Sequence, residues 1–100
     1  MINVIIPVHN RIKYTVECIN SLKKQDCSSK LKIFIVDDGS IDNTKKIINK
    51  KFPEIKIFKG NGSLFWGGAV NYGIEKVLKS AKKNDWILLV NNDVEFKSNA

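Results

Sequence analysis

Several features that define common protein classes are scarce in this chain of 100 residues. There are only two cysteines, and the spacing of Cys18 and Cys27 matches neither a zinc site nor a redox motif. No apolar run approaches the roughly 20 residues of a membrane-spanning helix, and residues 1–8 lack the basic start of a signal peptide. These absences predict a cytoplasmic protein whose thiols are reduced.

Arginine is scarce as well. The net charge is +7, yet Arg11 is the only arginine, so lysine supplies nearly all of the positive charge. Proteins that read nucleic-acid sequences rely on arginine forks and stacked aromatic rings, and no recognition motif for nucleic acid occurs here. We therefore expect no nucleic-acid partner. The lysines recur on the polar faces of predicted helices, which is typical of a solvated surface, although the excess charge still favours anionic partners such as nucleotides or lipid headgroups.

What the chain does contain is a regular alternation of two hydrophobic patterns. Short apolar runs predict strands, and apolar residues spaced by three and four predict helices. The predicted strands are 3–8, 33–36, 55–58 and 85–90, and the predicted helices are 12–24, 42–51 and 68–83. Strands that alternate with helices through short connections form right-handed βαβ units. We therefore expect one α/β domain with a Rossmann-like three-layer α/β/α arrangement and a mainly parallel sheet.

The stretch 33–44, IFIVDDGSIDNT, organises this pattern. Its apolar start predicts a strand buried on both faces, and the strand ends abruptly in two carboxylates, Asp37 and Asp38. In open α/β sheets, ligands bind at the carboxyl ends of the strands. The alternative is a turn followed by a helix cap, since Asp, Gly and Ser all favour such positions.

Polar residues follow two other predicted strands. His9 and Asn10 follow the first strand, whose end is marked by Pro7, and Asn92 and Asp93 follow the last. All carboxyl ends of a parallel sheet meet at one edge, so these residues are expected to converge on the acidic turn after the second strand. Amide and carboxylate oxygens are ligands that Mg²⁺ or Mn²⁺ accepts, although a single carboxylate is a weak metal signal and a strand-end turn is the alternative.

A glycine-rich loop, GNGSLFWGG at 60–68, leads into the third predicted helix. Glycines let the backbone approach a ligand, and a helix that begins near Gly68 offers N–H groups to a phosphate. The loop is not a Walker loop, since it contains no Gly-Lys-Ser/Thr, and it is not the dinucleotide fingerprint, because Phe65 stands where the third glycine would be. Phe65 and Trp66 either pack into the core or form the wall of a sugar or base pocket.

These segments, in this order, resemble the nucleotide-binding half of the family 2 glycosyltransferases, which have the GT-A fold. The matching segments are VIIPVHNR for the opening strand and loop, IFIVDDGSIDNT for the acidic signature, GSLFWGGAVNYGI for a segment of rhamnosyltransferase-like members, and WILLVNNDVEF for a variant DxD motif. The resemblance covers essentially the whole chain. It departs from the family pattern at His9, where an aromatic residue is commoner, and at Asn92, which replaces an acidic residue.

The resemblance implies a nucleotide-diphosphate-sugar donor, UDP- or dTDP-linked, bound with a divalent Mg or Mn ion. Asp38 is expected to read the pyrimidine base, and Asp93 to bind the metal. The implied donor-binding residues are Pro7, Val8, His9, Asn10, Asp38, Gly67, Gly68, Asn71, Asn92 and Asp93.

Family members continue with a second half that binds a glycan or lipid-linked acceptor and supplies the general base for inverting transfer. We therefore expect residues 1–100 to be a donor half truncated after the DxD-like motif, with no catalytic residue and no activity alone. The resemblance suggests a role in cell-envelope polysaccharide synthesis, in the cytoplasm or at the inner face of the membrane. The apolar strand 86–90 would then be an unpaired edge, which is expected to form a homodimer. A non-catalytic nucleotide-binding module is the alternative that the residues leave open.

Overall fold

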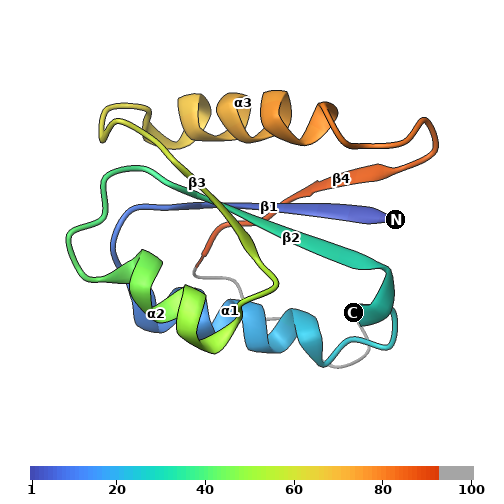
Figure 1. The fold of residues 1–100 in the computed structure, drawn as a ribbon, viewed down its shortest axis with the longest axis horizontal. Coiled ribbons are helices and arrows are strands. Elements are labelled where there is room, and N and C mark those ends of the chain that lie inside the picture. The colour runs from blue at the N-terminus through green and yellow to red at the C-terminus, as the bar shows by residue number, and fades with distance from the viewer. Residues whose placement is uncertain (93–100) are drawn as a thin grey trace.

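A computed structural model describes residues 1–92. The elements are β1 (Ile2–Val8), α1 (Ile12–Lys23), a 3₁₀ turn (Ser28–Lys30), β2 (Leu31–Asp37), α2 (Thr44–Lys51), β3 (Lys56–Lys59), α3 (Phe65–Leu78) and β4 (Trp86–Leu89). The strands form one parallel sheet in the order β3-β2-β1-β4. Helix α3 covers one face of the sheet, and α1 and α2 cover the other (Figure 1). The three-layer α/β/α fold predicted from the sequence is confirmed.

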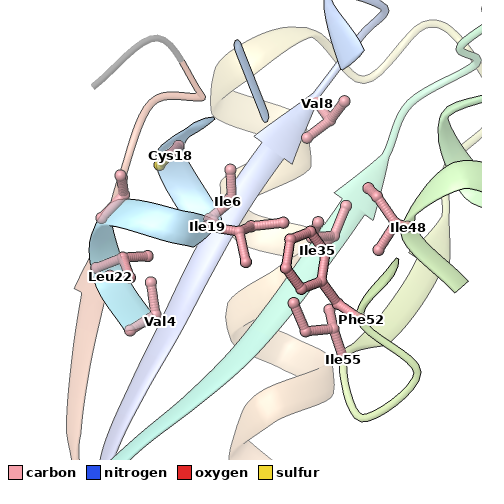
Figure 2. Close-up of a cluster of buried hydrophobic side chains, with 11 residues drawn as sticks. Val4, Ile6, Val8, Cys18, Ile19, Leu22, Ile35, Ile48, Phe52 and Ile55 are labelled. Atoms are coloured by element: carbon pink, nitrogen blue, oxygen red, sulfur yellow. The ribbon is translucent and has the colours of Figure 1, made fainter. Parts of the chain in front are cut away.

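Both faces of the sheet are buried, which explains the continuous apolar runs of β1 and β2. Val4, Ile6 and Ile35 point toward α1 and α2, where they pack in one core cluster (Figure 2). Ile5 and Phe34 alternate with them and point toward α3, where they belong to a second cluster. Because β1 and β2 are the two central strands and are packed on both faces, their carboxyl ends lie between the two layers of helices.

Pro7 lies within the central strand β1, where proline is normally excluded because it has no N–H. The carbonyl of Ile5 accepts a hydrogen bond from the Val90 nitrogen at 3.0 Å, so Ile5 bonds toward β4. Alternate residues of a parallel strand bond to the same neighbour, and Pro7 therefore also faces the β4 side. The last β1–β4 pair is Ile5 with Leu89, so the missing N–H of Pro7 costs no ladder bond.

Helix α3 lies very close to the sheet because it carries a glycine at the contact. Gly73 is buried, and a Cβ built on it would lie 2.7 Å from Cγ2 of Ile5 and 3.0 Å from Cγ2 of Val36. Both of these side chains are fully buried and β-branched, so they have little freedom to move away. The hydrophobic pattern of α3 did not single out Gly73.

The bounds of α3 differ from the prediction. The helix begins at Phe65 rather than near Gly68, for a reason that belongs to the site described below, and it ends at Leu78 rather than near Lys83. Ala81 still packs against the second core cluster, which prolonged the apolar pattern beyond the helix. No helix within residues 1–92 is long and apolar enough to cross a membrane.

Candidate functional site

Three loops meet at the carboxyl edge of the sheet, on the left in Figure 1: residues 9–11 after β1, 38–43 after β2 and 60–64 before α3. Between them lies a cavity of about 310 Å³. Its lining residues are Pro7, Val8, His9, Asp38, Gly62, Phe65, Trp66 and Ala69. A recess of about 530 Å³ exists elsewhere, but it lies at the start of β2, away from the strand ends that carry the polar residues. The cavity at the carboxyl edge is therefore the candidate site.

Asp38 is buried at the centre of this edge, and its carboxylate organises the glycine loop. Its Oδ1 accepts a hydrogen bond from the Gly62 nitrogen at 2.7 Å. Its Oδ2 accepts from the nitrogens of Leu64 and Phe65, both at 3.0 Å. A carboxylate at the first amides of a helix satisfies donors that lack intrahelical partners and interacts favourably with the helix dipole. Asp38 is thus the cap of α3, which explains why the helix begins at Phe65.

The carboxylate of Asp38 retains one unused acceptor position. An ionised carboxylate offers about four lone-pair positions, and the backbone of the glycine loop occupies three of them. The cap therefore does not prevent Asp38 from accepting one further hydrogen bond.

The glycines of the loop allow two backbone segments to approach each other. A Cβ on Gly39, whose φ is +76°, would lie 2.7 Å from the Cα of Gly62, and a Cβ on Gly60 would lie 2.7 Å from Oδ1 of Asp38. The sequence predicted that these glycines bring the backbone close to a ligand. In the structure, Gly60 and Gly62 bring it close to the turn that follows β2, and Gly62 also lines the cavity.

His9 is exposed at the rim of the cavity. Its Nδ1 lies 2.5 Å from the carbonyl oxygen of Asp38. A carbonyl oxygen only accepts, so Nδ1 carries the proton of this hydrogen bond and Nε2 remains available for a ligand.

Asn10 does not line the cavity but joins two loops. Its backbone nitrogen donates to Oγ of Ser40 at 2.8 Å, and its Oδ1 accepts from the nitrogen of Ile41 at 2.8 Å. The φ angle of Asn10 is 62° and that of Arg11 is 59°, a left-handed conformation that asparagine tolerates better than most residues. Through these two bonds, Asn10 fixes the position of the β2–α2 loop beside the site.

Asp42 strengthens the same junction. Its Oδ2 accepts a hydrogen bond from the nitrogen of Ile12 at 3.0 Å, so it caps α1 from the neighbouring loop. Its Oδ1 accepts from the hydroxyl of Thr44. Burial acts to raise the pKa of Asp42, but the hydrogen bonds from Thr44 and Ile12 together hold this pKa below its ordinary value.

The two aromatic residues of the glycine loop are exposed, Phe65 by 79% and Trp66 by 55%. Of the two alternatives that the sequence left open, the structure therefore favours the pocket wall over the core. Phe65 has a φ of 57°, which is strained for a bulky residue. The indole Nε1 of Trp66 donates to Oδ1 of Asn91 at 2.6 Å and so links the start of α3 to the segment after β4.

Gly67, Gly68 and Asn71 lie in the first two turns of α3 but do not line the cavity. A Cβ on Gly67 would meet no atom within 4 Å, and Asn71 is exposed. The amide of Gly68 donates to the carbonyl of Leu64 at 3.0 Å. Asp38 accepts hydrogen bonds from the amides of Leu64 and Phe65. The amides of the next two residues, Trp66 and Gly67, are therefore those that the helix leaves without an intrahelical acceptor.

Asn92 is half-buried, and its Nδ2 donates to Oγ1 of Thr15 at 3.1 Å, which leaves its Oδ1 available. Asp93, the expected metal ligand, lies outside the described residues. Within residues 1–92, no group of three or more His, Cys, Asp or Glu side chains could hold a metal ion.

Sequence reasoning missed Ser40, Asp42 and Asn91 as parts of this edge. Ser40 and Asp42 belong to the stretch 33–44, whose polar residues predict only a turn or a cap for the helix that follows. Their partners lie about 30 residues earlier, in the loop after β1. No sequence pattern indicated the pair formed by Asn91 and Trp66.

Comparisons with known proteins agree with this architecture. The model of the family "Glycosyl transferase family 2" matches residues 3–100. MG060, an uncharacterized glycosyltransferase of Mycoplasma genitalium, is 33% identical over 102 residues, which cover 95% of this chain and 33% of MG060. The crystal structure of S. aureus TarS 1–349 in complex with UDP-GlcNAc matches with a TM-score of 0.73 and 32% identity, over 92% of this chain and 26% of that one.

A third likeness concerns the fold alone. Mannosyltransferase PcManGT from Pyrobaculum calidifontis, solved in complex with GDP-Man and Mn²⁺, matches with a TM-score of 0.75 at 19% identity, over 95% of this chain and 28% of that one. The chain spans about a third of the length of the curated relatives that it matches over nearly all of its own length. Since the family match extends over nearly every residue, as the four sequence motifs predicted, the chain belongs to glycosyltransferase family 2.

Proposed function

We propose that residues 1–100 form the donor-binding half of a glycosyltransferase and bind a nucleotide-diphosphate sugar at the carboxyl edge of the sheet. The observation that carries this proposal is one combination: the cavity has exposed aromatic walls and the unused acceptor position of Asp38, and the unpaired amides at the start of α3 lie next to these walls. The likeness to TarS, whose structure contains UDP-GlcNAc, supports it.

The base is proposed to lie between the walls of the cavity. A uracil or thymine ring has one imide N–H, which matches the one acceptor position that the cap of α3 leaves on Asp38. Phe65 and Trp66 offer faces on which such a ring can stack. The donor would then be UDP- or dTDP-linked.

The diphosphate is proposed to lie at the N-terminus of α3. The amides of Trp66 and Gly67 lack intrahelical acceptors, and the positive end of the helix dipole attracts anions. Gly67 has no side chain, and the space around its Cα is open, so nothing at this position obstructs a diphosphate. Val8, Pro7 and His9 would form the opposite side of the same site.

A divalent metal, Mg or Mn, is proposed to bind at Asp93 together with the diphosphate. Oδ1 of Asn92 fits this role because the hydrogen bond to Thr15 uses only the NH₂ group of the amide. Mn²⁺ in the structure of PcManGT supports metal dependence for proteins of this fold. Such an ion, when bound, neutralises charge on the leaving diphosphate. The residues of this chain would orient the donor and exclude water from the base.

The acceptor is proposed to be a glycan or a lipid-linked glycan, and the transfer to invert the anomeric centre, in the context of cell-envelope polysaccharide synthesis. An inverting displacement needs a base that deprotonates the acceptor hydroxyl. Among residues 1–92, the one carboxylate that lines the cavity is that of Asp38, and it holds the glycine loop. We therefore expect no transfer by this chain alone.

The proposed location is the cytoplasm, at the inner face of the membrane where a lipid-linked acceptor would be held. A homodimer through β4 is also proposed, because this edge strand exposes Trp86 by 74% and, within residues 1–92, pairs with β1 alone.

Calorimetric titration with UDP and dTDP, with and without Mn²⁺, tests the donor site. Phe65→Ala should weaken nucleotide binding about tenfold through lost stacking. Tyr14→Ala is the matched control, since Tyr14 is an aromatic residue on α1 that is 50% exposed and does not line the cavity. Equal effects of the two substitutions, or no binding of either nucleotide by the unchanged protein, would contradict the proposal. A non-catalytic nucleotide-binding module would pass this test, and only a transfer assay with acceptors on the longer protein separates the two.

A further inference from the structure

A second recess, which we call the lysine recess, lies on the α3 face of the sheet and belongs to no part of the donor site. Its volume is about 320 Å³. It is lined by Lys32, Phe34, Lys56, Phe58, Lys76, Lys79 and Ser80. Four of these residues carry a positive charge and none carries a negative one, so the charge of the lining has a single sign.

Two neighbouring strands supply the floor of the lysine recess. The rings of Phe34 on β2 and Phe58 on β3 are stacked, with centroids 5.9 Å apart and planes inclined by 9°. The ammonium group of Lys32 lies 5.3 Å from the ring centroid of Phe34, and that of Lys56 lies 5.4 Å from the ring centroid of Phe58. The aromatic floor therefore holds two cations side by side through cation–π contacts.

Helix α3 supplies the other two lysines. Lys76 and Lys79 lie at its C-terminal end, where the helix dipole favours positive charge whatever the protein does. The dipole does not explain Lys32 and Lys56, which come from the sheet. Among residues 1–92, the ion pairs are Met1 with Asp85 and Lys23 with Glu54, so none of the four recess lysines has an acidic partner.

We propose that the lysine recess binds a phosphate-bearing anion. Like charges that gather without a counter-ion repel each other, and an anion in the recess removes this cost. Lysine binds phosphate as a point charge, and the volume falls at the lower end of the range typical for small-ligand sites. Two sources carry this chemistry, the headgroup of an anionic lipid and a soluble polyphosphate.

The position of the recess gives this binding a consequence. Helix α3 begins at the donor cavity and ends at the lysine recess, and its 14 residues make it about 20 Å long. A lipid headgroup held in the recess would fix one end of α3 at the membrane surface and leave the cavity at the other end open. The proposal does not depend on the donor site, because it uses other residues.

The test compares two double variants that remove the same charge. Lys32→Gln/Lys56→Gln removes the two positive charges that the sheet contributes to the recess. Lys13→Gln/Lys50→Gln removes two exposed lysines from α1 and α2, on the opposite face of the sheet. One probe is sedimentation with phosphatidylcholine vesicles that contain phosphatidylglycerol, against vesicles of phosphatidylcholine alone. The other probe is titration with inorganic tripolyphosphate in the presence of saturating UDP, which keeps the donor cavity occupied.

The recess variant should lose about 30-fold in affinity, since each lysine near an anionic surface contributes roughly fivefold. The control should lose less than about threefold. If the recess variant binds the anionic vesicles more weakly than the control does, the ligand is a lipid headgroup. If the two variants differ only in tripolyphosphate binding, the ligand is a soluble anion. Both outcomes support the site. Equal losses in the two variants, or no binding of either probe by the unchanged protein, would overturn it. Thermal unfolding followed by circular dichroism checks that both variants are folded.

Discussion

The carboxylate of Asp38, at the end of β2, lies 3.0 Å from the backbone nitrogen of Phe65, the first residue of α3. One side chain therefore sets the start of the helix and the position of the aromatic residues that wall the cavity. The residue that the family resemblance assigns to base reading is also a structural cap. Loss of Asp38 should accordingly affect folding and binding together, whereas loss of a wall residue should affect binding alone.

The first prediction concerns this cap. Asp38→Ala removes the acceptor of three backbone amides and should lower the free energy of unfolding by about 1–3 kcal/mol, because these donors lose their partner. Urea denaturation measures the change. Asp26→Ala, at an exposed acid in the loop after α1, is the control and should stay within about 0.5 kcal/mol of the unchanged protein. Equal stability of the two variants would mean that Asp38 is not the cap.

The second prediction compares two glycines of α3. Gly73→Ala should destabilise the protein by about 1–3 kcal/mol, because its Cβ would lie 2.7 Å from the buried Ile5 side chain. Gly67→Ala places its Cβ in open space and should be neutral or stabilising by up to about 1 kcal/mol, since alanine is the better helix former. Thermal unfolding of both variants provides the measurement. A stabilising Gly73→Ala would show that α3 can move away from the sheet at little cost.

These residues also show what could be predicted from the sequence. The apolar runs of β1 and β2 and the spacings in α1 are local patterns, so they were sufficient for the layers and the parallel sheet. The start of α3 was missed because Asp38, far away in the chain, decides it. The bond between Trp66 and Asn91 spans 25 positions and has no local signal. Pattern reasoning therefore located the edge of the sheet but not the bonds that hold it together.

The third prediction concerns pH. The hydrogen bonds of Asp42 outweigh its partial burial and hold its pKa below the ordinary value of 3.8. The folded state thus binds this proton less tightly than the unfolded state. The stability that ionised Asp42 contributes is complete at pH values above its ordinary pKa of 3.8. This contribution is lost as the pH falls through the lower pKa that Asp42 has in the folded state. Glu54 and Asp85, whose pKa values are also lowered by hydrogen bonds, act in the same direction.

Asp42→Asn should therefore make the loss of stability below about pH 4 less steep. Urea unfolding at a series of pH values measures the slope. Asp26→Asn serves as a control that removes a carboxylate without removing a cap. If the slopes of both variants equal that of the unchanged protein, Asp42 does not contribute to acid sensitivity.

The fourth prediction concerns the edge of the sheet. Leu88 and Leu89 of β4 are each 39% exposed, and the outer side of the strand has no partner strand within residues 1–92. Light scattering at high protein concentration should detect a dimer, and Leu88→Lys should shift it toward the monomer, because an edge charge opposes strand pairing. Leu78→Lys, at an exposed leucine that ends α3, is the control. A sharp monomer peak for the unchanged protein would argue against pairing through β4.

The last prediction concerns the bond between Trp66 and Asn91, which joins the wall of the cavity to the segment that continues into Asn92 and Asp93. Trp66→Phe keeps an aromatic wall but loses the indole N–H. If the bond positions the segment for the metal, this variant should weaken nucleotide binding about three- to tenfold in the presence of Mn²⁺ and leave metal-free binding nearly unchanged.

Asn91→Ala should have the same metal-dependent effect, and the double variant should lose no more than either single one, because both substitutions remove one shared interaction. Calorimetric titration of UDP with and without Mn²⁺ completes this cycle. Additive losses would mean that Trp66 and Asn91 act separately. A loss that is equal with and without Mn²⁺ would mean that Trp66 contributes to stacking alone, and the link between the cavity wall and the metal segment would then have no role in binding.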